Sequence, residues 1–146
     1  MIKAIVFDFD GVLAESVNVK TRAYSDLFKD EDEGTVRQIV AYHLKNAGVS
    51  RFEKFKVIYR EILKKPLSDE NFNFLCGQFS QLVVEKVISS PWVEGACEFL
   101  QNNKDLYSFF VVSGTPEDEL KEIIRRRGME NYFDDVDNIW KRISKK

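Results

Sequence analysis

Two short apolar runs interrupt a chain in which hydrophobic and charged positions otherwise mix. Ile2 to Phe7 and Leu106 to Gly114 are rich in β-branched or aromatic residues, and both runs are short for helices. Continuous apolar runs of this length are typical of strands that are buried on both faces of a parallel sheet. Asn131 to Val136 predicts a brief third strand.

The long stretch between the two apolar runs shows the spacing of amphipathic helices. One apolar stripe runs from Phe52 to Leu63, and a second runs from Phe72 to Val87 behind Ser68, a residue suited to an N-cap. Weaker helical patterns cover residues 19–29 and 35–46. The pattern therefore predicts about four helices inserted between the strands as a compact subdomain, with the phenylalanine stripes in its core.

Two further helices are expected on either side of the second strand. Residues 90–100 begin the helix that leads back to the sheet. After the second strand, Thr115 suits the N-cap, Pro116 the first helical position, Arg125 to Arg127 the last turn and Gly128 the stop. The final residues, 138–146, predict a short terminal helix or a frayed tail.

Composition favours a globular domain and gives no reason to expect nucleic acid or a membrane as a partner. Of the 146 residues, 44% are hydrophobic and 32% are charged, with a formal net charge of −2. No apolar run approaches the roughly 20 residues of a membrane span, and the start lacks the apolar region of a signal peptide. Cys76 and Cys97 stand far apart without metal-ligand spacing, so we expect buried free thiols in a reducing cytoplasm.

Candidate chemistry lies where the two predicted strands end. Asp8 and Asp10 leave the first strand two residues apart, hence on one side of it, and Gly11 allows a tight turn behind them. Ser113 and Gly114 end the second strand before a helix N-terminus, whose amides and dipole favour an anion. Because ligands of open parallel sheets bind at the carboxyl ends of strands, we expect the two ends to hold one phosphate.

These motifs, in this order, resemble the haloacid dehalogenase (HAD) superfamily of hydrolases. The matching segments are "DFDGVLAES", "SPWVEGACEFL" and "VVSGTP", and His43 to Leu63 is similar to cap segments of phosphoglycolate-phosphatase-like members. The resemblance implies an α/β fold with a Rossmann-like parallel sheet core, incomplete at its C-terminal end, and an inserted α-helical cap. The implied core comprises residues 1–16 and 91–146, and the cap residues 17–90.

The resemblance also implies roles for the residues at the strand ends. Asp8 would attack phosphorus and form an aspartyl-phosphate, and Asp10 would protonate the leaving oxygen and then activate water. Ser113 and Gly114 would bind the phosphoryl oxygens. Mg²⁺ would be held by the Asp8 carboxylate and the Asp10 main-chain carbonyl. The implied activity is the hydrolysis of a small phosphorylated metabolite.

The sequence departs from the family pattern after Val136. The expected lysine has only Lys141 and Lys145 near its place, without the usual preceding turn, and Asp134 and Asp135 come too early for the acidic metal ligands. The activity is therefore expected to be weak, or to need residues from a partner chain. Without the later strands, Ile2 to Phe7 would form an exposed sheet edge, which we expect the C-terminal segment or self-association to cover.

Several alternatives remain open at this point. The two aspartates would also suit a polar strand end, and Ser113 would suit a structural cap. Arg51 and Lys54 of the cap are equally consistent with substrate contacts and with a solvated helix face, whereas His43 is interpreted as an ordinary surface or core residue. A sugar-phosphate mutase, or a catalytically silent domain that binds phosphate or a partner, would fit the same motifs.

Overall fold

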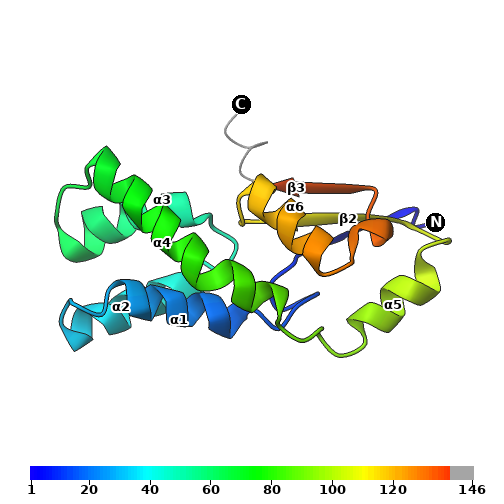
Figure 1. Cartoon of the computed structure of the whole chain (residues 1–146), viewed down its shortest axis with the longest axis horizontal. Coiled ribbons are helices and arrows are strands. Elements are labelled where there is room, and N and C mark those ends of the chain that lie inside the picture. The colour runs from blue at the N-terminus through cyan, green and yellow to red at the C-terminus, as the bar shows by residue number, and fades with distance from the viewer. Residues whose placement is uncertain (139–146) are drawn as a thin grey trace. The chain divides into compact units, whose positions relative to one another are not determined.

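The computed structural model describes residues 1–138 of the chain (Figure 1). The elements are β1 (Ala4–Phe7), α1 (Val17–Leu27), α2 (Glu33–Lys45), α3 (Arg51–Val57), the π-helix η1 (Ile58–Leu63), α4 (Asp69–Ile88), α5 (Ala96–Asn103), β2 (Ser108–Ser113), α6 (Glu117–Arg126), the 3₁₀ turn η2 (Glu130–Tyr132) and β3 (Asp135–Asn138). The terminal helix expected after Asn138 lies outside the described residues, as do Lys141 and Lys145.

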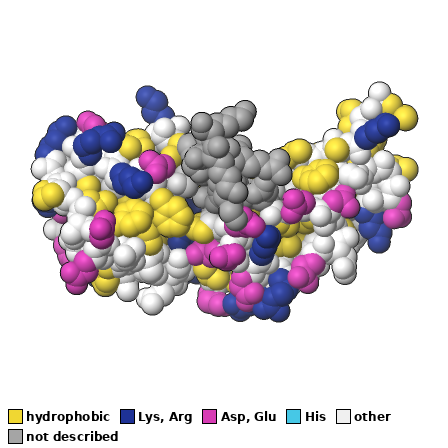
Figure 2. Space-filling model, turned by 90° about the horizontal axis from the view of Figure 1, so that it is seen from above, with side chains coloured by type: hydrophobic (Ala, Val, Ile, Leu, Met, Phe, Trp, Pro, Cys, Tyr) yellow, Lys and Arg dark blue, Asp and Glu magenta, His cyan; other side chains and the backbone are white. Residues whose placement is uncertain are grey.

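The chain divides into two compact units. The first, here called the sheet unit, comprises Met1–Val17 and Lys86–Lys146, and the second, the helical unit, comprises Asn18–Glu85. The sequence-based division, with a cap over residues 17–90, stays a proposal beside these bounds. On the face that Figure 2 shows, basic and acidic side chains interleave over both units, in keeping with the small net charge.

The α/β fold predicted from the sequence is confirmed by a parallel three-stranded sheet in the order β1-β2-β3. Phe7 of β1 pairs with Val111 of β2, and Ser113 of β2 pairs with Asn138 of β3. The predicted third strand exists, but it begins at Asp135 rather than at residue 131. The first residues of the predicted strand belong to η2 instead. The strand begins next to Asp134, whose amide donates to Phe109 O at 2.8 Å.

β1 is not buried on both faces, contrary to the sequence-based expectation. Its residues alternate between exposed and half-buried, and Val6 is 62% exposed. On the covered face, the Phe7 ring makes edge contacts with Phe99 of α5 and with Phe109 of β2. The reason lies in the strand order: among the described residues β1 pairs only with β2, so it forms a sheet edge, as the incomplete core predicted.

The sheet unit also contains a clamp where α4 ends. The Arg127 guanidinium donates from Nη1 to the carbonyls of Val87, Ile88 and Ser90 at 2.7–2.9 Å, and it lies 5.5 Å from the centre of the Trp92 ring. Sequence reasoning assigned Arg127 to the C-terminus of its own helix. The structure shows that it instead satisfies carbonyls at the C-terminus of α4, where helix carbonyls have no partner within the helix.

The helical unit is built on the predicted stripes, with the predicted N-cap at Ser68 and a further N-cap at Asp32 that the sequence analysis did not name. The Asp32 side chain accepts from the Thr35 amide at the start of α2, and the Ser68 hydroxyl accepts from the Asn71 amide at the start of α4. The buried hydrophobic side chains of this unit are Ala23, Tyr24, Phe28, Ile39, Phe55, Ile58, Leu75, Phe79 and Val83. The placement of Phe52 in the core was wrong, because the side chain lies at the surface, where its ring contacts that of Phe72.

Two smaller expectations also change. Pro116, not Thr115, is the N-cap of α6, because the Thr115 side chain is buried against Ser113 and the helix begins one residue later. The stop at Gly128 is confirmed by its left-handed φ of 67°. Cys76 and Cys97 form no disulfide, and they are half-buried rather than buried. No helix among the described residues has the length and hydropathy needed to cross a membrane.

We expect Arg127→Met to lower the free energy of unfolding by about 2–3 kcal/mol, because three carbonyls lose a charged donor. The measurement is urea unfolding of the intact chain, followed by tryptophan fluorescence. Arg125→Met is the matched control, since Arg125 is exposed and pairs only at the surface with Glu122. Equal losses of unfolding free energy in the two variants would contradict a stabilising role of the Arg127 clamp.

Candidate active site

The carboxyl ends of β1 and β2 lie side by side, and the predicted site residues follow them. Phe7 is the last paired residue of β1, so Asp8 leaves the sheet next to the end of β2, which finishes at Ser113. Asp8 is exposed, and its Oδ1 accepts from the Phe9 amide at 2.7 Å. Parallel pairing therefore brings together two chain segments that are about a hundred residues apart in sequence.

A tight turn behind β1 holds the two aspartates. Phe9 between them is buried, and its carbonyl accepts from the amides of Leu13 and Ala14 at 2.9 and 3.2 Å. Gly11 closes the turn with φ 77°, and its amide donates to Ala14 O at 2.8 Å. Phe9 is thus buried in the interior, whereas Asp8 before it is exposed and Asp10 after it is half-buried.

Ser16 orients the second aspartate. Its buried hydroxyl donates to Asp10 Oδ1 at 2.6 Å and lies 3.3 Å from Ala14 O. The single hydroxyl proton can go to the Asp10 carboxylate when this is ionised. It can go to Ala14 O when a protonated Asp10 donates to the serine oxygen. Sequence reasoning gave Ser16 no role, and its only signal was a small hydroxyl residue shortly after the acidic pair.

The Ser113 side chain makes local structural contacts, which is one of the two roles that the sequence left open for it. Its hydroxyl donates to Thr115 Oγ1 at 3.2 Å and accepts from the Thr115 amide at 3.1 Å, and both side chains are buried. Gly114 between them is half-buried. This local turn fixes the backbone between the end of β2 and the start of α6.

The oxygen donors at this edge fit a magnesium ion only as a partial ligand set. Among residues 1–138, no three His, Cys, Asp or Glu side chains gather closely enough to form a metal centre by themselves. Mg²⁺ commonly takes one or two carboxylates together with waters and substrate phosphates. Asp8 and the Asp10 carbonyl match that smaller requirement.

The two cationic residues predicted from the cap both lie on α3 of the helical unit, and both are buried. Arg51 Nη1 donates to Ser80 Oγ at 2.7 Å, and its guanidinium lies 4.7 Å from the centre of the Phe79 ring. Lys54 Nζ lies 3.0 Å from His43 Nδ1. The alternative of a solvated helix face is therefore wrong, because Arg51 is 5% exposed and Lys54 only 2%.

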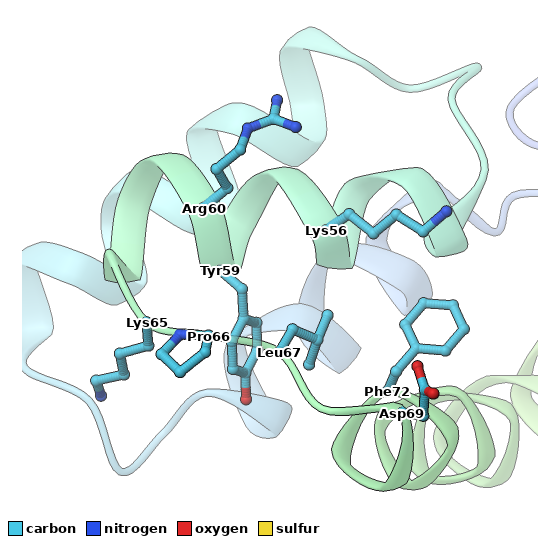
Figure 3. Close-up of a pocket in the computed structure, with 8 residues that line it drawn as sticks. All are labelled: Lys56, Tyr59, Arg60, Lys65, Pro66, Leu67, Asp69 and Phe72. Atoms are coloured by element: carbon cyan, nitrogen blue, oxygen red, sulfur yellow. The ribbon is translucent and has the colours of Figure 1, made fainter.

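The helical unit also has an open pocket of about 440 Å³, and none of the predicted site residues lines it (Figure 3). Tyr59, Leu67 and Phe72 line it, and Arg60 points away from it. Its other two basic residues are held in ion pairs, Lys56 with Glu53 at 3.0 Å and Lys65 with Glu31 at 2.8 Å. These pairs neutralise the basic rim, so the pocket does not have the charge of a phosphate site.

The chain belongs to the family of haloacid dehalogenase-like hydrolases, which it matches over residues 2–146. This confirms the family inferred from the motifs. A curated relative, "Phosphorylated carbohydrates phosphatase" of Thermotoga maritima, is 26% identical over 134 residues, which are 91% of this chain and 59% of that protein.

Solved structures share the fold. A β-phosphoglucomutase from Clostridium difficile superposes with a TM-score of 0.72 at 19% identity, covering 97% of this chain and 63% of that one. A predicted phosphoglycolate phosphatase from Haemophilus somnus gives a TM-score of 0.69 at 18% identity, covering 94% and 62%. The chain thus spans about three-fifths of the length of these relatives.

We expect Gly11→Ala to destabilise the chain by about 1–3 kcal/mol, because the left-handed φ strains a side chain. The added Cβ would also lie 3.0 Å from Val17 Cγ2. Gly77→Ala is the control: a Cβ there meets nothing within 4 Å, and alanine favours the α4 helix by about 0.5–1 kcal/mol. Thermal unfolding measures both, and a neutral Gly11→Ala would contradict the strained turn.

Proposed function

We propose that this protein hydrolyses phosphate monoesters of small metabolites through an aspartyl-phosphate on Asp8. The observation that carries the proposal is the pair Asp8 and Asp10, which flank the buried Phe9 at the carboxyl end of β1 beside the end of β2. A nucleophilic carboxylate and a second carboxyl group on one side of a turn are what a two-step phosphoryl transfer requires.

In the first step, an Asp8 carboxylate oxygen forms a bond to phosphorus while the bond from phosphorus to the ester oxygen breaks. Protonated Asp10 gives its proton to that leaving oxygen. In the second step, Asp10 takes a proton from water, whose oxygen attacks phosphorus and releases inorganic phosphate and the Asp8 carboxylate. The Ser16 hydroxyl can donate to Asp10 when Asp10 is ionised and accept from it when it is protonated.

The phosphoryl group carries negative charge next to two acids, so the site needs positive potential. We propose that the Asp8 carboxylate and the Asp10 main-chain carbonyl hold Mg²⁺, which would neutralise charge on the phosphoryl oxygens. A solved structure of this fold, the HAD-hydrolase YfnB of Bacillus subtilis, is bound to magnesium. Ser113 and the Gly114 amide are the proposed contacts to the phosphoryl oxygens.

The substrate class proposed is a small phosphorylated metabolite, as the name of the Thermotoga relative suggests for that protein. Arg51 and Lys54 are the proposed contacts of the helical unit to a negative group of the substrate, because two buried cations share one face of α3. A cytoplasmic location is proposed because the two cysteines form no disulfide.

A sugar-phosphate mutase is the second candidate, favoured by the fold shared with β-phosphoglucomutase. In that case a sugar hydroxyl, not water, would take the phosphoryl group from Asp8. Phosphate release from a sugar monophosphate separates the two activities: a phosphatase liberates stoichiometric phosphate, whereas a mutase returns an isomeric sugar phosphate.

We expect Asp8→Asn to abolish phosphate release, because an amide cannot act as the nucleophile. We expect Asp10→Asn to lower kcat by about 10²–10⁴-fold through loss of the acid and base. The assay is release of p-nitrophenol from p-nitrophenyl phosphate with Mg²⁺ present and after its removal by chelation. Activity that survives Asp8→Asn would sink the enzyme proposal and leave a silent binding domain.

Ser16→Ala removes the hydroxyl that orients Asp10, so we expect kcat to fall about tenfold, the equivalent of one hydrogen bond of roughly 1.4 kcal/mol, with KM little changed. Ser16→Thr keeps the hydroxyl and is the matched control, which should retain most of the activity. Equal losses in both variants would point to packing rather than to orientation of Asp10.

We also propose that the chain self-associates through the β1 edge, because an exposed apolar strand readily pairs with another chain. Val6→Lys should abolish a concentration-dependent rise in sedimentation mass. Phe74→Lys is the matched control, since Phe74 is 63% exposed against 62% for Val6 but lies in α4. A monomeric mass together with fast amide exchange over residues 2–7 would refute the association.

A further inference from the structure

The open pocket of the helical unit has no part in the proposed phosphatase chemistry. Its volume of about 440 Å³ is of the size that small-molecule sites have, roughly 300–1,000 Å³. Three neighbouring stretches of chain enclose it: the end of α3 with η1, the connection at residues 64–68, and the first turn of α4 (Figure 3). All of them belong to the helical unit, so this unit forms the pocket by itself.

The walls of the pocket are aromatic and aliphatic side chains that are only half-buried. They are Tyr59 of η1, Leu67 of the connection and Phe72 of α4. The Phe72 ring packs at a tilt on Phe52, with centres 6.0 Å apart, and the Tyr59 ring packs on Phe28 at 6.4 Å. Each ring is thus supported by a second ring and still lines the hollow, which suits the binding of a flat aromatic body.

The backbone beside the pocket has an unusual conformation. The π-helix η1 ends at Lys64, which adopts a left-handed φ of 54° although it is not glycine. The Tyr59 carbonyl accepts from the amides of both Lys64 and Lys65, the second at 3.0 Å. π turns are rare and frequent at functional sites, and a left-handed non-glycine residue is costly. This turn brings the chain back from Tyr59 to Leu67, so that both line one pocket.

The polar groups of the pocket differ in whether they have partners. Lys56, Arg60 and Lys65 are each held in an ion pair with a glutamate. Within residues 1–138, by contrast, the Asp69 carboxylate and the Tyr59 hydroxyl make neither a hydrogen bond nor an ion pair. A carboxylate accepts hydrogen bonds and repels anions. The pocket therefore offers an acceptor to a donor group of a ligand, and it does not favour a negative one.

Asp69 also has an ordinary role, because an acid in the first turn of α4 complements the helix dipole. Glu70 stands in the same turn and has the same role, but it does not line the pocket. Asp69 precedes Phe72 by three residues, which places the two on one face of α4. A ring that rests on Phe72 can therefore direct a donor group to the Asp69 carboxylate.

We propose that this pocket is a second binding site, which takes small planar aromatic molecules that carry a hydrogen-bond donor and no negative charge. Phenols and indoles are such molecules. The ring packs against Phe72 and Leu67, and its donor group faces Asp69. The inference is independent of the proposed phosphatase activity, because it concerns residues that take no part in that reaction.

The test compares indole with benzofuran, which has the same shape but a ring oxygen in place of the N–H. Each is titrated into the intact chain and followed by ¹⁵N–¹H NMR. We expect indole to bind with a Kd of about 1 mM or tighter, and to shift the amides of Tyr59, Leu67 and Asp69 more than those of the sheet unit. Benzofuran should bind about tenfold more weakly, because it lacks the donor.

Two pairs of variants test the contacts. Asp69→Ala should weaken indole about tenfold and leave benzofuran unchanged, whereas Glu70→Ala, its matched control, should leave both unchanged. Phe72→Leu should weaken both molecules alike. Phe74→Leu is its control, since Phe74 is an exposed residue of α4 that does not line the pocket. Circular dichroism checks that each variant keeps its helices, and the wild-type titration locates the site without any variant.

Several results would overturn the inference. They are the absence of indole binding up to about 10 mM, equal affinity for indole and benzofuran, and amide shifts centred outside the pocket. Equal effects of Asp69→Ala and Glu70→Ala would do the same. A titration with inorganic phosphate that shifts the same amides would also overturn it, because the pocket would then be an anion site.

Discussion

The parallel pairing of β1 with β2 is the constraint on which the candidate site depends. The two strands are separated by about a hundred residues of sequence, yet their register places Phe7 beside Val111 and so brings both carboxyl ends to one edge. The cost of closing such a long loop grows only slowly, by about 0.6 kcal/mol for each doubling of its length. A helical unit can therefore be inserted between the strands without loss of the pairing.

The chemistry proposed for that edge would depend on a short turn held by buried atoms. Phe9 anchors the turn in the interior, Gly11 supplies a backbone conformation that other residues resist, and Ser16 holds the carboxyl group of Asp10. The aspartates are thereby oriented before any substrate arrives. Preorganisation of this kind lowers the cost of reaching a transition state, because the groups do not have to be ordered during the reaction.

Local signals in the sequence predicted much of this structure. Periodicity and caps predicted the positions of the helices, as Ser68 did for α4. The apolar run of β1 predicted that the two aspartates follow the end of a strand. Features that depend on distant contacts were missed. The exposed face of β1 follows from its place in the sheet, and the clamp at Arg127 joins carbonyls about forty residues earlier. Likewise, no spacing rule connects His43 with Lys54, because they meet only when α2 packs against α3.

Family membership and fold are established for this chain, which spans about three-fifths of the length of its relatives. The central claim is the proposed formation of an aspartyl-phosphate on Asp8. The most direct test is to trap the covalent intermediate. The chain is mixed with a ³²P-labelled phosphate ester and Mg²⁺ and quenched rapidly in acid, and the labelled peptide is identified by mass. The account predicts an acid-stable, hydroxylamine-labile phosphate on Asp8. Label on another residue, or equal label on Asp8→Asn, would contradict it.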